Sequence, residues 1–187
     1  MKRSEVNKAV RDSKIFFENN HWVLPPEPKW DVTDFGLGDL LNYGLVLINL
    51  AEESEYCEKL MYATRNQKTP AHTHKKKKED IICRNGILIV QVWKGLPDLR
   101  DEVFELKVNG QNRQVRSGEK LKLMSGERVT LTPGIYHEFY PESEECIISE
   151  VSTANDDLHD NFFVSKDIGR FSSIEEDEPP LVDLVSD

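Results

Sequence analysis

Most of the chain alternates short apolar or β-branched runs with turn residues, which is the pattern of a β-rich domain. Asn-Gly, Ser-Gly and Pro-Gly pairs stand between many of these runs. No helical pattern interrupts them and no segment repeats at a fixed period, so the pattern predicts an all-β sandwich or closed barrel. The predicted strands cover residues 45–50, 81–83, 87–93, 103–108, 120–123, 128–131 and 146–151.

The N-terminal region has a helical pattern instead. Four apolar side chains recur among charged residues with a helical period, and Ser4 is the expected N-cap. Prolines at 25, 26 and 28 then end the helix. We expect residues 1–30 to form a helical arm with a Pro-rich connector packed on the barrel, and residues 31–187 to form the barrel with a C-terminal segment. The arm either covers the barrel or crosses to a second subunit. The four apolar residues are Val6, Val10, Phe16 and Phe17.

The end of the chain is acidic at residues 175–178 and apolar afterwards. We expect the acidic run to stay in water and the apolar residues to pack against the body of the protein.

Length and charge restrict the function. A chain of 187 residues suits one domain, and its net charge of −10 disfavours nucleic acid and favours a small neutral substrate. The three cysteines form no CxxC pair, which fits a reducing compartment. No apolar signal core or membrane-spanning stretch of roughly 18 residues is present, so a cytoplasmic protein is expected.

The segment PAHTHKKKKED at residues 70–80 carries a candidate metal site. Side chains two residues apart on a strand face the same side, so His72 and His74 can share one ion. Glu79 has an odd offset from His74 and joins them only if a turn or bulge lies within 75–78. His137 follows the Pro-Gly turn at 133–134 and is the fourth candidate ligand. Three imidazoles and one carboxylate suit a divalent metal such as Mn²⁺, Co²⁺, Fe²⁺, Ni²⁺ or Zn²⁺.

The spacing of these residues resembles the two cupin motifs: HxH, Glu79 and Gly86 match the first, and PGxxH the second. Asn66 stands where the first motif usually begins with glycine. The resemblance implies an all-β, single-domain cupin, that is, a jelly-roll-like β-barrel with an N-terminal helical arm.

A finer resemblance covers nearly the whole chain. The blocks MKRSEVN (1–7), WDVTDFGLGD (30–39), EDIICRNG (79–86), EVSTANDD (150–157), IGRF (168–171) and EEDEPPL (175–181) are similar to D-lyxose isomerases. This resemblance implies a homodimeric enzyme that interconverts D-lyxose with D-xylulose, and D-mannose with D-fructose, using a divalent metal that is usually Mn²⁺. Lys75 stands where the family often has an aromatic residue, which bears on the wall of the sugar pocket.

Aldose–ketose isomerisation needs a positioned acid or base. Lys77 is a candidate because the loop between His74 and Glu79 can carry it to the metal, whose charge would lower the pKa of Lys77. Glu150 is a candidate because it ends an apolar strand, where a buried carboxylate costs free energy and is expected only if it has a function. The other three lysines of the run 75–78 are expected in solvent.

Asp160 and Arg170 lie in the late family-like stretch, where they can fold over the pocket. Arg170 can equally pair with the acidic run at 175–178, and this is the favoured alternative. The general base is left open among Lys77, Glu150 and Asp160. Rival functions on the same ligands are an Fe(II) dioxygenase and a non-catalytic sugar-binding cupin; the carboxylate-rich late stretch disfavours the dioxygenase.

Overall fold

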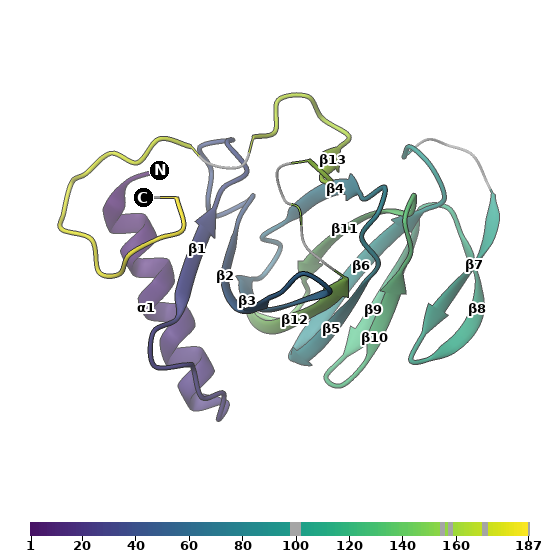
Figure 1. Cartoon of the computed structure of the whole chain (residues 1–187), viewed down its shortest axis with the longest axis horizontal. Coiled ribbons are helices and arrows are strands. Elements are labelled where there is room, and N and C mark those ends of the chain that lie inside the picture. The colour runs from purple at the N-terminus through teal and green to yellow at the C-terminus, as the bar shows by residue number, and fades with distance from the viewer. Residues whose placement is uncertain (98–101, 154–155, 157–158, 170–171, 187) are drawn as a thin grey trace.

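The structure is a computed structural model that describes residues 1–97, 102–153, 156, 159–169 and 172–186. It confirms the predicted all-β fold, with helix α1 (Arg3–Asn19) lying against one end of two antiparallel sheets (Figure 1). The strands are β1 (Lys29–Thr33), β2 (Leu45–Glu52), β3 (Tyr56–Thr64), β4 (Thr69–Thr73), β5 (Glu79–Asn85), β6 (Ile87–Trp93), β7 (Val103–Val108), β8 (Gln111–Arg116), β9 (Glu119–Met124), β10 (Arg128–Leu131), β11 (Tyr136–Pro141), β12 (Glu145–Thr153) and β13 (Phe162–Phe163).

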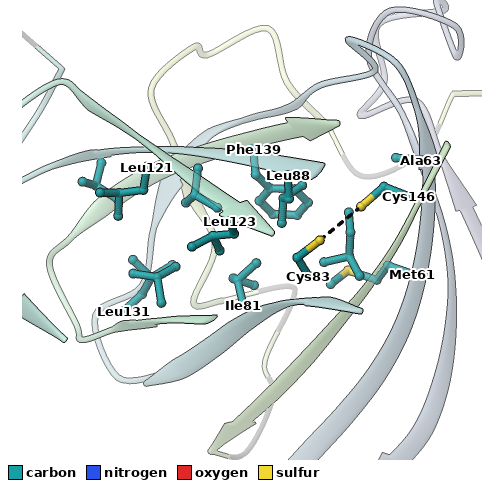
Figure 2. Packing of buried hydrophobic residues seen from close by; sticks show 14 of the residues in the cluster. Met61, Ala63, Ile81, Cys83, Leu88, Leu121, Leu123, Leu131, Phe139 and Cys146 are labelled. Atoms are coloured by element: carbon teal, nitrogen blue, oxygen red, sulfur yellow. Dashed lines mark hydrogen bonds between the residues drawn. The ribbon is translucent and has the colours of Figure 1, made fainter. Parts of the chain in front are cut away.

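The two sheets enclose one apolar core between them. The larger sheet has the order β1-β2-β3-β12-β5-β10-β7-β8, and the smaller one β13-β4-β11-β6-β9. Leu88, Leu123 and Phe139 of the smaller sheet meet Met61 and Ile81 of the larger one in a single buried cluster (Figure 2). Burial of this inward-facing set is the main source of stability for such a fold.

Helix α1 covers the outer face of the larger sheet. Val6, Val10 and Phe17 are fully buried there against a second cluster that includes Val32 and Leu60. On the first three strands the residues therefore alternate between the helix side and the barrel interior, as the pleat requires.

The helix begins two residues earlier than expected, and the prediction that Ser4 is its N-cap is wrong. Lys2 occupies the cap position and its amide donates to the Glu5 carboxylate at 2.7 Å. Ser4 lies in the first turn, where its amide and hydroxyl donate to Asp177 at 2.8 and 2.6 Å. A carboxylate from the far end of the chain thus replaces the local cap, and its charge suits the helix N-terminus.

The acidic run 175–178 is largely exposed, as predicted, but its carboxylates also have partners on α1. Glu176 accepts two hydrogen bonds from the buried Arg3 guanidinium at 2.8 and 2.7 Å, and Glu178 accepts one from Asn7 at 2.6 Å. The run therefore lies along α1, as the neighbouring chain ends in Figure 1 show. The apolar end packs as predicted at Leu184, which is buried in the cluster under the helix.

Two motif positions have backbone conformations that explain their residues. Asn66, where glycine was expected, has φ 62°, a left-handed conformation that asparagine tolerates better than most side chains. Gly86 has φ 98°, and a Cβ there would lie 2.5 Å from Ser143 Oγ. Both residues therefore let the chain turn tightly beside the strands that carry the site.

Among the described residues, the one helix is too short and too polar to cross a membrane.

Candidate metal centre

The four predicted ligands converge from two sheets. His72 lies on β4 and His137 on β11, where they are directly opposed, and His74 follows the end of β4. Glu79 begins β5 in the other sheet, so the turn expected within 75–78 also carries the chain across the barrel. All four side chains are buried, and one ligand atom from each lies within 4.8 Å of the others.

The backbone sets the tautomer of each histidine. Nδ1 lies 2.8 Å from the Pro70 carbonyl in His72, 2.6 Å from the Asp160 carbonyl in His74 and 3.4 Å from the Ile135 carbonyl in His137. A carbonyl only accepts, so each Nδ1 carries the ring proton and each Nε2 keeps a lone pair. This outer arrangement is the usual support for a metal-binding imidazole.

The lone pairs face one another without a donor between them. Glu79 Oε1 lies 2.9 Å from His137 Nε2 and 3.3 Å from His74 Nε2. Within the described residues, all three atoms are buried and have no hydrogen-bond partner. A cation among them removes this repulsion, and the mixed N/O set suits a divalent metal. The residues present therefore fit such an ion.

The charge states of the ligands agree with metal binding. Burial, followed by the neighbouring His137 and His74, holds the pKa of His72 well below its usual value, so the ring is neutral. Burial alone would raise the pKa of Glu79, but the Lys77 ammonium outweighs it and holds the pKa well below its usual value. The carboxylate is therefore ionised, as a ligand must be.

Lys77 is buried between two carboxylates. Its Nζ lies 2.8 Å from Glu79 Oε2 and 2.9 Å from Glu150 Oε1. Burial would lower its pKa, but Glu79 and Glu150 raise it above the usual value. The predicted lowering of the Lys77 pKa rested on a metal cation alone, and these two anions act in the opposite direction. The other lysines of the run are exposed, as predicted.

Asp160 lies behind the loop that carries Lys77. Its carboxylate accepts hydrogen bonds from the Lys75, Lys76 and Lys77 amides at 2.8–3.2 Å. These donors outweigh the effect of burial and lower the pKa of Asp160. Its oxygens are therefore occupied with holding the loop. Arg170, the fourth catalytic candidate, lies outside the described residues.

A cavity of about 340 Å³ opens beside the ligands. Lys77, Glu79 and Glu150 form its polar side, while Phe35, Phe163 and Ile168 contribute apolar surface. Lys75 is not among the lining residues; its ammonium lies 4.1 Å from the Phe162 ring centroid.

Two charged residues that line this cavity, Asp31 on β1 and Lys59 on β3, were not among the predicted site residues. The sequence did contain one indication of Asp31. In β1 it lies between two apolar residues, as a polar residue facing the other side of a strand would.

A family model described as D-lyxose isomerase matches residues 27–187. The chain belongs to the D-lyxose isomerase family. Two relatives named D-lyxose/D-mannose isomerase support this membership over the full length. The Escherichia coli O157:H7 protein is 32% identical and the match covers 100% of this chain and 98% of the relative. The Serratia proteamaculans protein is 37% identical over 96% of this chain and 94% of the relative.

Solved structures place this D-lyxose isomerase family member in the cupin fold that its motifs predicted. The L-ribose isomerase of Acinetobacter sp. DL28, solved with L-ribose, matches with a TM-score of 0.71 and 17% identity, covering 94% of this chain and 98% of that one. The Cellulomonas parahominis L-ribose isomerase with L-psicose matches with a TM-score of 0.73 and 16% identity over the same shares. At this identity the likeness concerns the fold alone.

Proposed function

We propose that the protein is a metal-dependent aldose–ketose isomerase that interconverts D-lyxose with D-xylulose and, on the same site, D-mannose with D-fructose. One observation carries the proposal: a buried His₃Glu set and a buried Lys77–Glu150 pair share one sugar-sized cavity. Family membership and two relatives named D-lyxose/D-mannose isomerase support the choice of sugars.

His72, His74, Glu79 and His137 hold the metal in this proposal. A divalent ion supplies Lewis-acid stabilisation of the negative charge that develops on the sugar oxygens O1 and O2. Mn²⁺ is the proposed native ion because its preference for oxygen ligands suits a site that must also accept sugar oxygens. Co²⁺, Fe²⁺, Ni²⁺ and Zn²⁺ are compatible with the same ligands.

Glu150 and Lys77 divide the proton transfers between them. The Glu150 carboxylate removes the proton from C2 and returns it to C1, which converts the aldose to the ketose through a cis-enediol. The Lys77 ammonium donates a proton to O1 and recovers one from the O2 hydroxyl, so the protons balance over the cycle. Lys77 contacts two carboxylates and is protonated at the start of the cycle, which leaves Glu150 as the base.

Asp160 is a positioning residue in this scheme. Its carboxylate is occupied by three backbone amides, so it holds the Lys77 loop rather than a substrate proton. Arg170 is retained as a proposed pocket residue on the family resemblance alone.

A cytoplasmic homodimer is the proposed form of the enzyme. Three buried free thiols support a reducing compartment. The family resemblance and the exposed apolar side chains Ile15 and Val23 of the arm support a second subunit. Light scattering coupled to size-exclusion chromatography gives the mass directly, and a monomeric mass contradicts the dimer.

The test is ketose formation from D-lyxose and D-mannose by metal-stripped protein after Mn²⁺ is restored, with His72→Ala as the matched variant. We expect turnover to return with the ion in the wild type and to be absent in the variant. Metal binding without turnover of either sugar overturns the isomerase assignment. Oxygen uptake with Fe²⁺ would then establish a dioxygenase, and sugar binding without turnover a binding protein.

A further inference from the structure

Two charged side chains face the barrel interior away from the metal ligands. Lys59 on β3 and Asp31 on β1 are each only 4% exposed and both line the cavity. Their apolar neighbours Leu60 and Trp30 point to the helix side, so strand alternation directs the charges inward. Burial of charge is costly, and the apolar core next to these positions shows that the fold does not require it.

The strand register places Lys59 beside the proposed base. Lys59 is the direct β-sheet partner of Glu150, which in turn bonds to Lys77. The cavity wall therefore alternates in charge from Glu79 through Lys77 and Glu150 to Lys59. Adjacent strands lie about 4.8 Å apart, so Lys59 stands one strand further from the metal than Glu150. This spacing between strands is comparable with the distance from C2 to the terminal hydroxyl of an open-chain pentose.

Asp31 extends the polar wall onto the sheet edge. It is opposed to Leu47 on β2, and Leu47 is opposed to Met61 on β3, so Asp31 lies in the row next to that of Lys59. Leu47 and Met61 line the cavity between the two charges. An ammonium and a carboxylate separated by apolar side chains match an open-chain sugar, whose hydroxyls donate and accept while its C–H groups are apolar.

We propose that Lys59 and Asp31 form a subsite for the hydroxyl groups at the end of the sugar remote from the metal, with Lys59 binding the terminal hydroxyl. The subsite rests on the proposed isomerase function for the identity of the sugar. It holds the chain so that C1 and C2 lie at the metal and Glu150. It acts on binding rather than on the proton transfers.

The test compares D-lyxose with 5-deoxy-D-lyxose in the wild type and in Lys59→Met, all with Mn²⁺ bound. Wild-type kcat/KM is expected to fall about tenfold or more when the terminal hydroxyl is removed, because a polar group of the site then loses its partner. Lys59→Met is expected to raise KM for D-lyxose with a smaller change in kcat, and to distinguish the two sugars about twofold or less. The two sugars differ in ring closure, but this affects both proteins equally.

Lys122→Met is the matched control, because Lys122 is exposed on β9 and pairs with Glu142 at the surface. It should discriminate between the sugars as the wild type does. Asp31→Asn is the second variant if Lys59→Met does not fold; it is expected to raise KM for D-lyxose with kcat nearly unchanged. Equal discrimination in wild type and Lys59→Met, or an unchanged KM in Asp31→Asn, overturns the subsite.

Equilibrium binding separates this proposal from the proposed function. Calorimetry of both sugars with the same proteins measures the discrimination without turnover. If the wild type binds D-lyxose but does not isomerise it, the isomerase assignment fails while loss of discrimination in Lys59→Met still establishes the subsite. If the wild type binds neither sugar, both proposals are overturned.

Discussion

The backbone carbonyl of Asp160 accepts a 2.6 Å hydrogen bond from Nδ1 of His74, although the two residues are 86 positions apart. The Asp160 carboxylate at the same time holds the amides of residues 75–77. A single residue of the late segment thus orients one metal ligand and fixes the loop that carries Lys77. This makes the late segment part of the site rather than a cover over it.

Replacing Asp160 with Asn tests this positioning role. The NH₂ of asparagine cannot accept from the loop amides, so at least one hydrogen bond to a charged group is lost, at a cost of about 1.5–3 kcal/mol. We expect kcat to fall about tenfold or more as Lys77 loses its position, while Mn²⁺ affinity changes less because the carbonyl to His74 remains. Urea unfolding, metal titration and steady-state kinetics measure the three effects.

Asp167→Asn is the control, because Asp167 is exposed on the same late segment. Its kinetics and stability should match those of the wild type. A kcat for Asp160→Asn equal to the wild-type value would show that the loop holds its position without Asp160.

The ligand set was predictable from the sequence because three of the four ligands lie close together along the chain. His72, His74 and Glu79 lie between β4 and the first residue of β5, and His137 follows a recognisable Pro-Gly turn. Strands β1 and β3 were not predicted as strands. Each has a charged residue, Asp31 or Lys59, at an inward-facing position where a barrel strand normally has an apolar side chain. The same two residues, Asp31 and Lys59, line the cavity.

Long-range polar contacts were the other feature that could not be predicted from the sequence. The acidic run 175–178 looks solvated in isolation, and only the folded chain brings it to Arg3 and Ser4. Strand β8 was also missed, because five of its six residues are exposed and it has no apolar face except at Val115. Local patterns carry no information about such partners.

Glu150→Gln separates chemistry from binding. The substitution keeps the shape and removes the charge, so metal and sugar should still bind while kcat falls about 10²–10⁴-fold. Glu145→Gln is the matched control on the same strand, since Glu145 accepts a 2.7 Å hydrogen bond from Tyr62 in the cluster under the helix. Turnover by Glu150→Gln at the wild-type rate would assign the base elsewhere.

The three cysteines should be inert in the folded protein. All are buried, and burial outweighs the lowering effect of Lys59 and raises the pKa of Cys57 to about 11. The Cys83 and Cys146 sulfurs lie 3.9 Å apart inside the barrel core (Figure 2). An aromatic disulfide reagent should therefore detect no thiol at neutral pH until denaturant is added, and all three afterwards. Rapid labelling without denaturant would contradict the buried placement.

The contact between Asp177 and Ser4 should make the arm sensitive to acid. The Ser4 hydroxyl and amide lower the pKa of Asp177 below its usual 3.8. A lowered folded-state pKa means that the stabilisation is complete above about pH 4 and is lost as the pH falls through the folded value. Asp177→Asn should thus be less stable than the wild type at pH 6, and the two should be equally stable at a pH below the folded-state pKa of Asp177. Asp183→Asn is the control, and parallel stability curves for Asp177→Asn and wild type would exclude this linkage.

The predicted division at residues 30 and 31 can be tested through Phe17. Strand β1 begins at Lys29 and is the edge strand of the larger sheet. Phe17 is 0% exposed and packs between the helix and this sheet. We propose that arm and barrel form one cooperative unit, because removing the arm would expose the outer cluster of the sheet. Phe17→Ala should cost about 3–5 kcal/mol of unfolding free energy, with one transition by both fluorescence and circular dichroism. Lys14→Ala is the control, since Lys14 is exposed on the same helix. A separate early transition in Phe17→Ala, with the metal site intact after it, would instead show that the barrel folds without its arm.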